Sequence, residues 1–390
     1  MTATVMGDVR ERWRMGVEAR ALVMLTSAIL AFGLAVLYSA SAVTALRQEG
    51  SSAFYLLRQL TGVAVGVVVF AAAAKMDAER WQRWAWPLMA ASLVMMTLVL
   101  ILPESIAPRV LGSRRFLIGS SLQPSEIGKV AVVIWTSMLI VKKGDALRRL
   151  TKGLLPFLLV VGALDVLAIL EPDLSVAMMY TLVMAIVLFA GGVRIGHFVA
   201  LGILAIPILW HEMQRVQYAL LRVMSFLGVG ADQDIINYQL RQSLIAVGSG
   251  GFFGRGFGEG RQQYGFLPMA PTDFIGSAVG EEWGFAGIAF LVVAFALYAY
   301  LGVSIARQAR SPFLQLVAIG LTVTTTITAY LHIGVVVGLL PTTGLTLPFV
   351  SYGRSNLVLS LFMTGMLVNI GSTKERVHGS SATNPLAAHA

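Results

Sequence analysis

The sequence predicts an all-α polytopic membrane protein with about ten transmembrane helices, and three observations support this fold class. Of its 390 residues, 57% are hydrophobic and only 13% are charged, and the mean hydropathy is +0.77. Such a composition is too apolar for the surface of a soluble domain. Apolar stretches long enough to cross a bilayer recur along the whole chain. Basic residues cluster between alternate stretches, as the positive-inside rule describes.

Each expected span is an apolar stretch bounded by polar or turn-forming residues. The expected spans cover residues 21–41, 60–74, 86–102, 125–141, 153–170, 174–190, 198–210, 284–305, 313–340 and 355–371. The first is too long and too far from the start to be a cleaved signal peptide. The one long connection, residues 211–283, follows the seventh span.

The distribution of lysine and arginine sets the expected orientation. Four arginines precede the first span, and further basic clusters at 75–83 and 142–152 fall on the same side of the membrane. We therefore expect both termini in the cytoplasm and the loop 211–283 outside it. This gives a cytoplasmic segment 1–20, a single transmembrane domain 21–371 and a disordered cytoplasmic tail 372–390.

Composition also excludes several classes of function. The chain has no cysteine, which excludes disulfides, thiolate catalysis and cysteine-ligated metals. Its net charge of +9 lies in short clusters between apolar stretches, which is typical of topology signals and contacts with anionic lipid rather than nucleic acid. The glycine-dense run 248–260 lacks the Gly-x-Gly-x-x-Gly spacing and the strand-to-helix context of a nucleotide site. We interpret it as a flexible or tightly turning loop.

Charged residues inside apolar stretches are candidates for function. Glu126 and Lys129 are three residues apart, so they share one helical face and can pair. An ion pair that fixes helix packing and a role in handling substrate or ions are equally compatible with this spacing. Asp165 and His332 lie deeper in their spans, and for them the packing role is favoured.

Two aspartates lie at expected helix starts on the outer side. In Glu171-Pro-Asp173 a capping role for Asp173 is favoured, because proline suits a helix start and a carboxylate can accept from the first amides. Asp273 ends the long loop and is compatible with an N-cap or with a general base at a membrane cavity. Spacing alone does not decide between these roles.

Four motifs in order resemble the SEDS family of shape, elongation, division and sporulation proteins, over nearly the whole chain. They are Gln123-Pro-Ser-Glu126-Ile-Gly-Lys129, Glu171-Pro-Asp-Leu174, Leu267-Pro-Met-Ala-Pro-Thr-Asp273-Phe and Leu345-Thr-Leu-Pro-Phe-Val-Ser-Tyr-Gly353. The stretches 340–349 and 222–227 are more similar to the division branch of the family than to the elongation branch. Phe116, Met269, Ala270, Arg354 and Asn356 depart from the usual family pattern.

The resemblance implies a peptidoglycan glycosyltransferase that polymerises lipid II into β-1,4 glycan strands, for cell division or cell shape, at the outer face of the bacterial inner membrane. It implies Asp273 as the catalytic base that deprotonates the acceptor hydroxyl. The implied substrate-binding residues are Gln123, Glu126 and Lys129 of the first motif, Ser351 of the last, and the basic residues Arg115 and Arg261.

Cofactors and partners follow from the same resemblance. A divalent cation, Mg²⁺ or Mn²⁺, is compatible with a diphosphate leaving group, although the sequence has no dedicated ligand cluster for it; no nucleotide or organic cofactor is expected. The implied partners are a class B penicillin-binding protein transpeptidase and other divisome or elongasome membrane proteins. The alternatives are a lipid II flippase or another membrane transporter, or a non-catalytic scaffold in which Asp273 only caps a helix.

Overall fold

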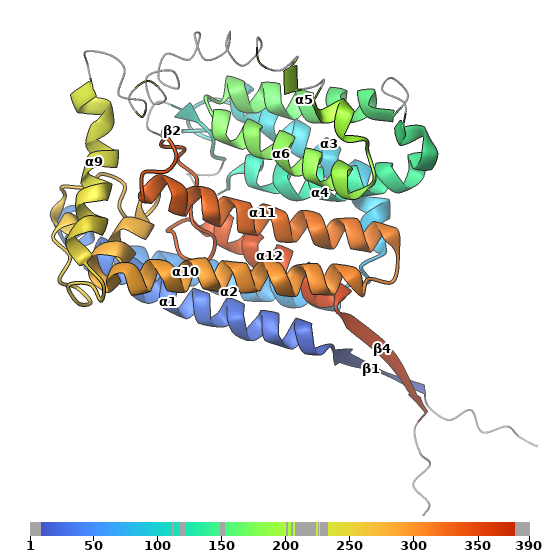
Figure 1. Cartoon of the computed structure of the whole chain (residues 1–390), viewed down its shortest axis with the longest axis horizontal. Helices are drawn as coiled ribbons and strands as arrows, with labels where there is room; N and C mark the ends of the chain where they lie inside the picture. The colour runs from blue at the N-terminus through green and yellow to red at the C-terminus, as the bar shows by residue number, and fades with distance from the viewer. Residues whose placement is uncertain are drawn as a thin grey trace, which may run out of the picture.

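The computed structural model describes residues 9–110, 113–117, 122–148, 153–199 and 233–378, together with a few isolated positions between 202 and 226. Long helices run side by side along one axis (Figure 1). The first six are α1 (Val17–Glu49), α2 (Phe54–Lys75), α3 (Arg80–Ile101), α4 (Pro124–Lys143), α5 (Leu155–Leu170) and α6 (Leu174–Ala190). The others that position the site are α9 (Gln233–Gly250), α10 (Ile275–Arg307), α11 (Pro312–Val336) and α12 (Arg354–Ile370).

The helical, membrane-type architecture expected from the sequence is confirmed. Within the described residues, six helices are long and apolar enough to cross a bilayer, namely α1, α2, α3, α4 with its 3-10 extension to Leu147, α10 and α11. The apolar helices α5, α6 and α12 are shorter. Most of the expected seventh span, 198–210, lies outside the described residues, as does most of the stretch 222–227.

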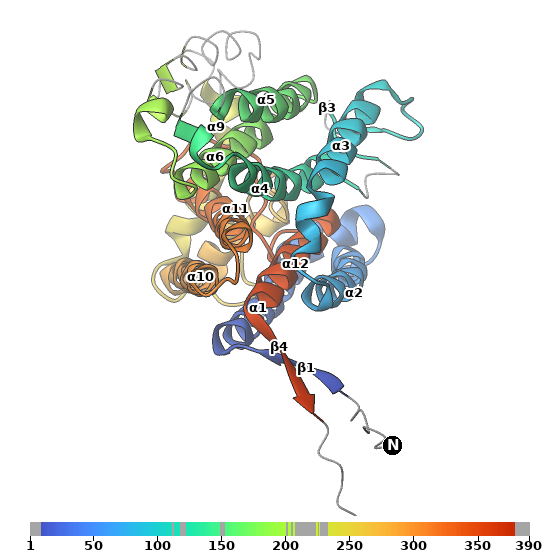
Figure 2. The ribbon, with the colours of Figure 1, turned by 90° about the vertical axis from the view of Figure 1, so that its right-hand side faces the viewer.

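Burial separates the central helices from the peripheral ones. In the most apolar window of each helix, 89% of the residues of α4 and 72% of those of α11 are buried, against 22% for α2. The end-on view shows α4 and α11 inside the bundle, between the α5–α6 pair and the group formed by α1, α2, α10 and α12 (Figure 2). Polar side chains on α4 and α11 therefore face other helices, where they can find partners.

The two ends of the described chain meet. Strand β1 (Val9–Met15) pairs antiparallel with β4 (Ser372–His378), and Gly16 donates its backbone N–H to Gly371 O at 3.1 Å. The sequence predicted a disordered tail after residue 371, but residues 372–378 form β4. The start of α1 and the end of α12 lie side by side, so the segments that extend them can pair. Residues 379–390 lie outside the described residues. A second short pair joins β2 (Arg109–Val110) to β3 (Ser113–Arg114).

Helix α10 is broken near its start. The sequence predicted a span from residue 284, but the helix begins at Ile275 and is interrupted at Gly284, whose φ of 64° lies in the left-handed region. In an unbroken helix the carbonyl of Glu281 would accept from the amide of Phe285. In this structure Glu281 O instead accepts from the amide of Arg255, a residue of the glycine-dense run, at 3.0 Å.

The glycine run supplies the missing partners of this break. Gly256 N donates to Glu282 O at 3.1 Å, while the amides of Phe285 and Ala286 donate to Gly251 O and Phe252 O at 2.9 and 3.0 Å. A Cβ atom on Gly254 would lie only 2.1 Å from Glu282 O, so the two backbones can approach this closely only because residue 254 has no side chain. The run is therefore a tight turn that satisfies the broken helix, as membrane proteins require of irregular backbone.

Candidate functional site

Asp273 lies in a tight turn directly before α10. The carbonyl of Met269 accepts from the amides of Thr272, Asp273 and Phe274 at 3.1, 3.1 and 3.3 Å, and Met269 itself has a positive φ of 58°. The N-cap position of α10 is Phe274 rather than Asp273. Asp273 is half-buried, and a Cβ atom built on Gly344 would lie 3.6 Å from its Oδ2 atom. The carboxylate therefore lies beside the loop 341–353.

Two residues of that loop, Ser351 and Tyr352, form hydrogen bonds with the backbone of the Asp273 turn. Ser351 donates its hydroxyl to Thr272 O at 2.7 Å and accepts the amide of Leu347 at 2.8 Å, and Tyr352 N donates to Pro271 O at 2.8 Å. Ser351 is only 5% exposed. Ser351 is thus bonded to the backbone of the Asp273 turn. Its contact with substrate stays a prediction.

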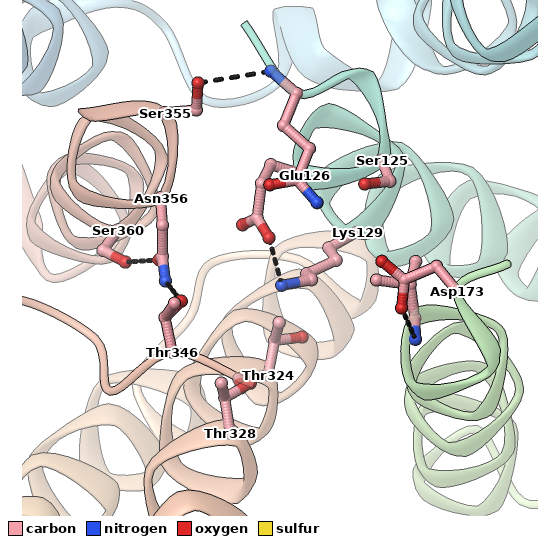
Figure 3. A network of polar contacts seen from close by, with 12 residues as sticks. Ser125, Glu126, Lys129, Asp173, Thr324, Thr328, Thr346, Ser355, Asn356 and Ser360 are labelled. Atoms are coloured by element: carbon pink, nitrogen blue, oxygen red, sulfur yellow. Dashed lines mark hydrogen bonds and ion pairs between the residues drawn. The ribbon is translucent and has the colours of Figure 1, made fainter. Parts of the chain in front are cut away.

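Glu126 and Lys129 form the ion pair that their spacing predicted. Lys129 Nζ lies 2.7 Å from Glu126 Oε1, and the two residues are 4% and 7% exposed. Figure 3 shows the pair projecting from α4 towards Thr324 and Thr328 of α11, with Asp173 on the other side. The pair thus lies among buried polar residues between the central helices.

Gln123 begins the same helix and ties it to α12. Its backbone N–H donates to Ser355 Oγ at 3.2 Å, and the residue is half-buried. Pro124 occupies the first helical position, where a missing N–H costs nothing because that amide has no partner within the helix. The predicted binding residues Gln123, Glu126 and Lys129 therefore share one helix start.

Arg115 is engaged by the turn between α5 and α6. Its guanidinium donates to Glu171 O at 3.3 Å and to Pro172 O, and lies 3.2 Å from Asp173 Oδ2. Asp173 also accepts the amide of Val176 at 3.2 Å, which confirms its predicted capping role. The guanidinium thus links three residues of one turn and is one-third exposed, with 32% of its side chain accessible.

The two carboxyl groups of this turn differ from ordinary ones. Burial raises the pKa of Asp173, although Arg115 opposes that shift and Lys129 does so more weakly. Burial, together with the neighbouring Asp173, raises the pKa of Glu171 to about 8. Glu171 is fully buried, and neither of its side-chain oxygens has a hydrogen-bond partner among the described residues. A protonated Glu171 at neutral pH follows from this environment.

The loop 341–353 is hydrogen-bonded to α6 and α12. Ser175 of α6 donates to Thr343 O at 2.5 Å, and the side chain of Asn356 in α12 donates to Thr346 Oγ1. Gly344, between these two contacts, lies against Asp273. The loop beside Asp273 is therefore tied to both α6 and α12. Arg261 is exposed, and its backbone amide donates to Glu281 Oε1 at 2.8 Å.

Comparison with known proteins identifies the chain's relatives. A family model described as "Cell cycle protein", which represents FtsW, RodA and SpoVE, matches residues 20–376. The chain belongs to this family. It is 38% identical over 366 residues to the "probable peptidoglycan glycosyltransferase FtsW" of Trichlorobacter lovleyi, covering 93% of this chain and 96% of that protein. It is 34% identical to the stage V sporulation protein E of Bacillus subtilis, over 90% of this chain and 95% of that one.

Solved structures share the fold. A chain from a structure titled "Structural coordination of polymerization and crosslinking by a peptidoglycan synthase complex" superposes with a TM-score of 0.74 at 24% identity, covering 90% of this chain and 97% of that chain. The rod shape determining protein RodA of Thermus thermophilus gives a TM-score of 0.66 at 25% identity, over 90% and 95% of the two chains. The family model and the FtsW relatives confirm the resemblance to the SEDS family that the four motifs predicted, and the chain is FtsW-like.

Sequence reasoning about this family member missed some residues near the site. Glu281, 2% exposed, accepts the amides of Arg261 and Gln262 at 2.8 and 3.1 Å. Glu282 accepts from Ser39 Oγ of α1 at 2.5 Å. The signal available was the adjacent acidic pair within an apolar stretch. Asp165, in contrast, accepts from Thr181 at 2.7 Å and links α5 to α6.

Within the part of the chain that the structure describes, no three side chains of His, Cys, Asp or Glu come together as metal ligands. The four charged residues Glu126, Lys129, Arg115 and Asp173 form two ion pairs instead. The divalent cation that the resemblance implies stays a prediction.

Proposed function

We propose that this protein is a peptidoglycan glycosyltransferase that polymerises lipid II into β-1,4 glycan strands at the outer face of the cytoplasmic membrane. Membership of the family and high-coverage relatives named as probable peptidoglycan glycosyltransferases support this activity. The observation that carries it in the structure is the placement of Asp273, whose carboxylate lies beside Gly344 in a turn fixed on both sides by backbone hydrogen bonds. A general base needs such a fixed position.

In the proposed reaction Asp273 removes the proton from the 4-hydroxyl of the acceptor GlcNAc. The hydroxyl oxygen then forms a bond to the anomeric carbon of the donor glycan, while the bond from that carbon to the lipid diphosphate breaks. Attack from the face opposite the leaving group gives inversion and a β-1,4 link. The diphosphate leaves with its electron pair and needs nearby positive charge.

The basic residues differ in their capacity to supply that charge. Lys129 is paired with Glu126 and Arg115 with Asp173, so each pair is close to neutral. Arg261 is exposed, and its side chain forms no ion pair within the described residues. We therefore assign the diphosphate contact first to Arg261. Contacts with the polar groups of the sugars are assigned to Gln123, Glu126, Lys129, Arg115 and Ser351. A Mg²⁺ or Mn²⁺ ion brought by the diphosphate would add to this charge.

The cellular setting follows from the same family. The proposal places the protein in the bacterial inner membrane with both termini in the cytoplasm and about ten spans, the long loop 211–283 facing outward. A structural neighbour is part of a synthase complex that, by its title, coordinates polymerization and crosslinking. This supports a class B penicillin-binding protein transpeptidase as partner, alongside other divisome or elongasome membrane proteins.

The test is glycan polymerisation from purified lipid II by the protein co-purified with its cognate transpeptidase. Asp273→Asn should abolish polymer while the thermal unfolding midpoint stays within about 2 °C of the wild type, because the change is isosteric. Glu259→Gln, the same chemical change at an exposed position of the glycine run, should leave polymerisation intact. Polymer from Asp273→Asn would remove Asp273 as the base. No polymer from the wild type, with lipid II movement across vesicles, would favour the flippase.

A further inference from the structure

His332 is a buried histidine whose two ring nitrogens have different partners. It lies in α11 and is 1% exposed. Its Nε2 atom lies 3.3 Å from the backbone amide of Gly276 in the first turn of α10, and its Nδ1 atom lies 2.8 Å from the carbonyl of Leu345. One side chain therefore joins three segments: α11, the start of α10 and the loop 341–353.

These two contacts fix the protonation state of the ring. A backbone amide can only donate, so Nε2 must be the acceptor and carries no proton. A carbonyl can only accept, so Nδ1 must carry the proton. His332 is therefore neutral in a single tautomer, and a charged imidazolium would lose the bond to Gly276.

The amide that His332 accepts is one that the helix cannot satisfy. Gly276 is the second residue of α10, and the first amides of a helix have no carbonyl partner within it. The N-cap residue Phe274 provides no side-chain acceptor. His332 thus caps α10 from a neighbouring helix, and the amide that it accepts belongs to Gly276, three residues after Asp273.

Gly276 is shaped for this contact. A Cβ atom at this position would lie 3.3 Å from His332 Nε2 and 3.2 Å from a methyl group of Val336. Since this is tighter than ordinary contact, a side chain at 276 would push the imidazole away from the amide. The glycine and the histidine therefore form one matched contact.

The Nδ1 side of the imidazole contacts the loop 341–353, which lies beside Asp273. Leu345, which accepts from Nδ1, directly follows Gly344, the residue whose added Cβ would lie 3.6 Å from Asp273 Oδ2. His332 thus holds both the helix that follows Asp273 and the loop beside its carboxylate. Ser351 of the same loop donates its hydroxyl to the carbonyl of Thr272, the residue before Asp273, at 2.7 Å.

We propose that His332 is a positioning residue for Asp273: its neutral ring sets the place of the Asp273 carboxylate relative to the loop 341–353 without touching substrate. The proposal rests on the proposed function for its catalytic consequence, but the contact itself does not. Because misplacement of a catalytic group by about 1 Å can cost about 100-fold in rate, loss of this contact should act on turnover.

The first test measures turnover with three variants. His332→Leu keeps the volume but neither hydrogen bond, and should lower kcat for lipid II polymerisation by about 10-fold to 100-fold with KM changed less than about threefold. His332→Asn keeps one donor and one acceptor and should stay within about fivefold of wild-type kcat. Thr326→Val alters a buried residue of α11 whose hydroxyl bonds its own helix at Thr322 O, and should have wild-type kcat.

The second test is independent of activity. Hydrogen–deuterium exchange of the peptide 274–283 should be faster in His332→Leu and in Gly276→Ala than in the wild type and in Thr326→Val, because the Gly276 amide loses its acceptor. Unchanged exchange in both variants would overturn the contact, even if the protein made no polymer. Faster exchange with wild-type kcat in His332→Leu, or an equal loss of kcat in His332→Asn and His332→Leu, would overturn the positioning role. Inactive wild-type protein would instead count against the proposed function.

Discussion

The Glu126–Lys129 pair allows structural and functional roles to be separated by a double-mutant cycle. Both partners are buried, at 7% and 4% exposure, and their charged atoms are 2.7 Å apart. Removing one partner from a buried pair typically costs about 3 to 5 kcal/mol, because the remaining charge is left without compensation. At about 2 °C per kcal/mol for a large domain, this corresponds to a loss of roughly 6 to 10 °C in the unfolding midpoint.

The surroundings make the two single changes unequal. After Glu126→Gln, the Lys129 ammonium still has Asp173 on its other side (Figure 3), and that carboxylate already interacts with it. After Lys129→Met, the Glu126 carboxylate is left with Asp173 as a like charge. We therefore expect Lys129→Met to reach the full cost and Glu126→Gln to cost about 1 to 3 kcal/mol. The double variant should be more stable than Lys129→Met by at least about 1 kcal/mol.

Thermal unfolding in detergent with all four proteins measures this coupling, and the polymerisation assay measures function on the same samples. A well-folded double variant without activity would assign the pair to substrate handling, whereas an active one would assign it to helix packing. The reasoning is refuted if the two single losses add in the double variant, because additive losses mean that the charges do not depend on each other.

Three further predictions concern the surrounding structure. The pKa of Glu171 in the folded protein is about 8, above its ordinary value, so its contribution to stability is complete at acid pH and is lost as pH rises to about 8. Glu171→Gln should therefore make the unfolding midpoint less dependent on pH between pH 5 and 8.5, and should raise that midpoint at pH 8.5. Gly254→Ala should lower the unfolding midpoint by several degrees, because residue 254 has a φ of +83° and the added Cβ would meet Glu282 O. The control Gly248→Ala should not lower it, because a Cβ atom there would meet nothing within 4 Å. Arg115→Lys should cost about 1 to 3 kcal/mol of unfolding free energy, because an ammonium cannot reproduce the forked contacts to the α5–α6 turn.

Local patterns in the sequence predicted local structure well. The i to i+3 spacing of Glu126 and Lys129 was sufficient to predict their pairing, and the Glu171-Pro-Asp173 order was sufficient to predict the cap on α6. Both features lie within a few residues of chain, where helix geometry determines the outcome. Their partners were not predictable: Arg115 meets the α5–α6 turn from 56 residues away, as judged by its bond to Glu171 O.

The surroundings of Asp273 and the start of α10 were not predictable for a related reason. Hydropathy placed the helix start at 284 because Glu281 and Glu282 lower the apolar average, yet both are buried, at 2% and 3% exposure, and hydrogen-bonded. The turn that carries Asp273 is held by Ser351, 79 residues away from its partner Thr272. Contacts at such separations leave no periodic signal in the sequence.

The pairing of β1 with β4 has a consequence for membrane topology that does not depend on counting apolar segments. Two strands can form an antiparallel ladder from Val9 opposite His378 to Met15 opposite Ser372 only in one compartment. A chain that returns to its starting compartment has crossed the bilayer an even number of times. Any topology with an odd number of crossings between residues 16 and 371 is therefore incompatible with this structure, and reporters fused to either end should give the same answer.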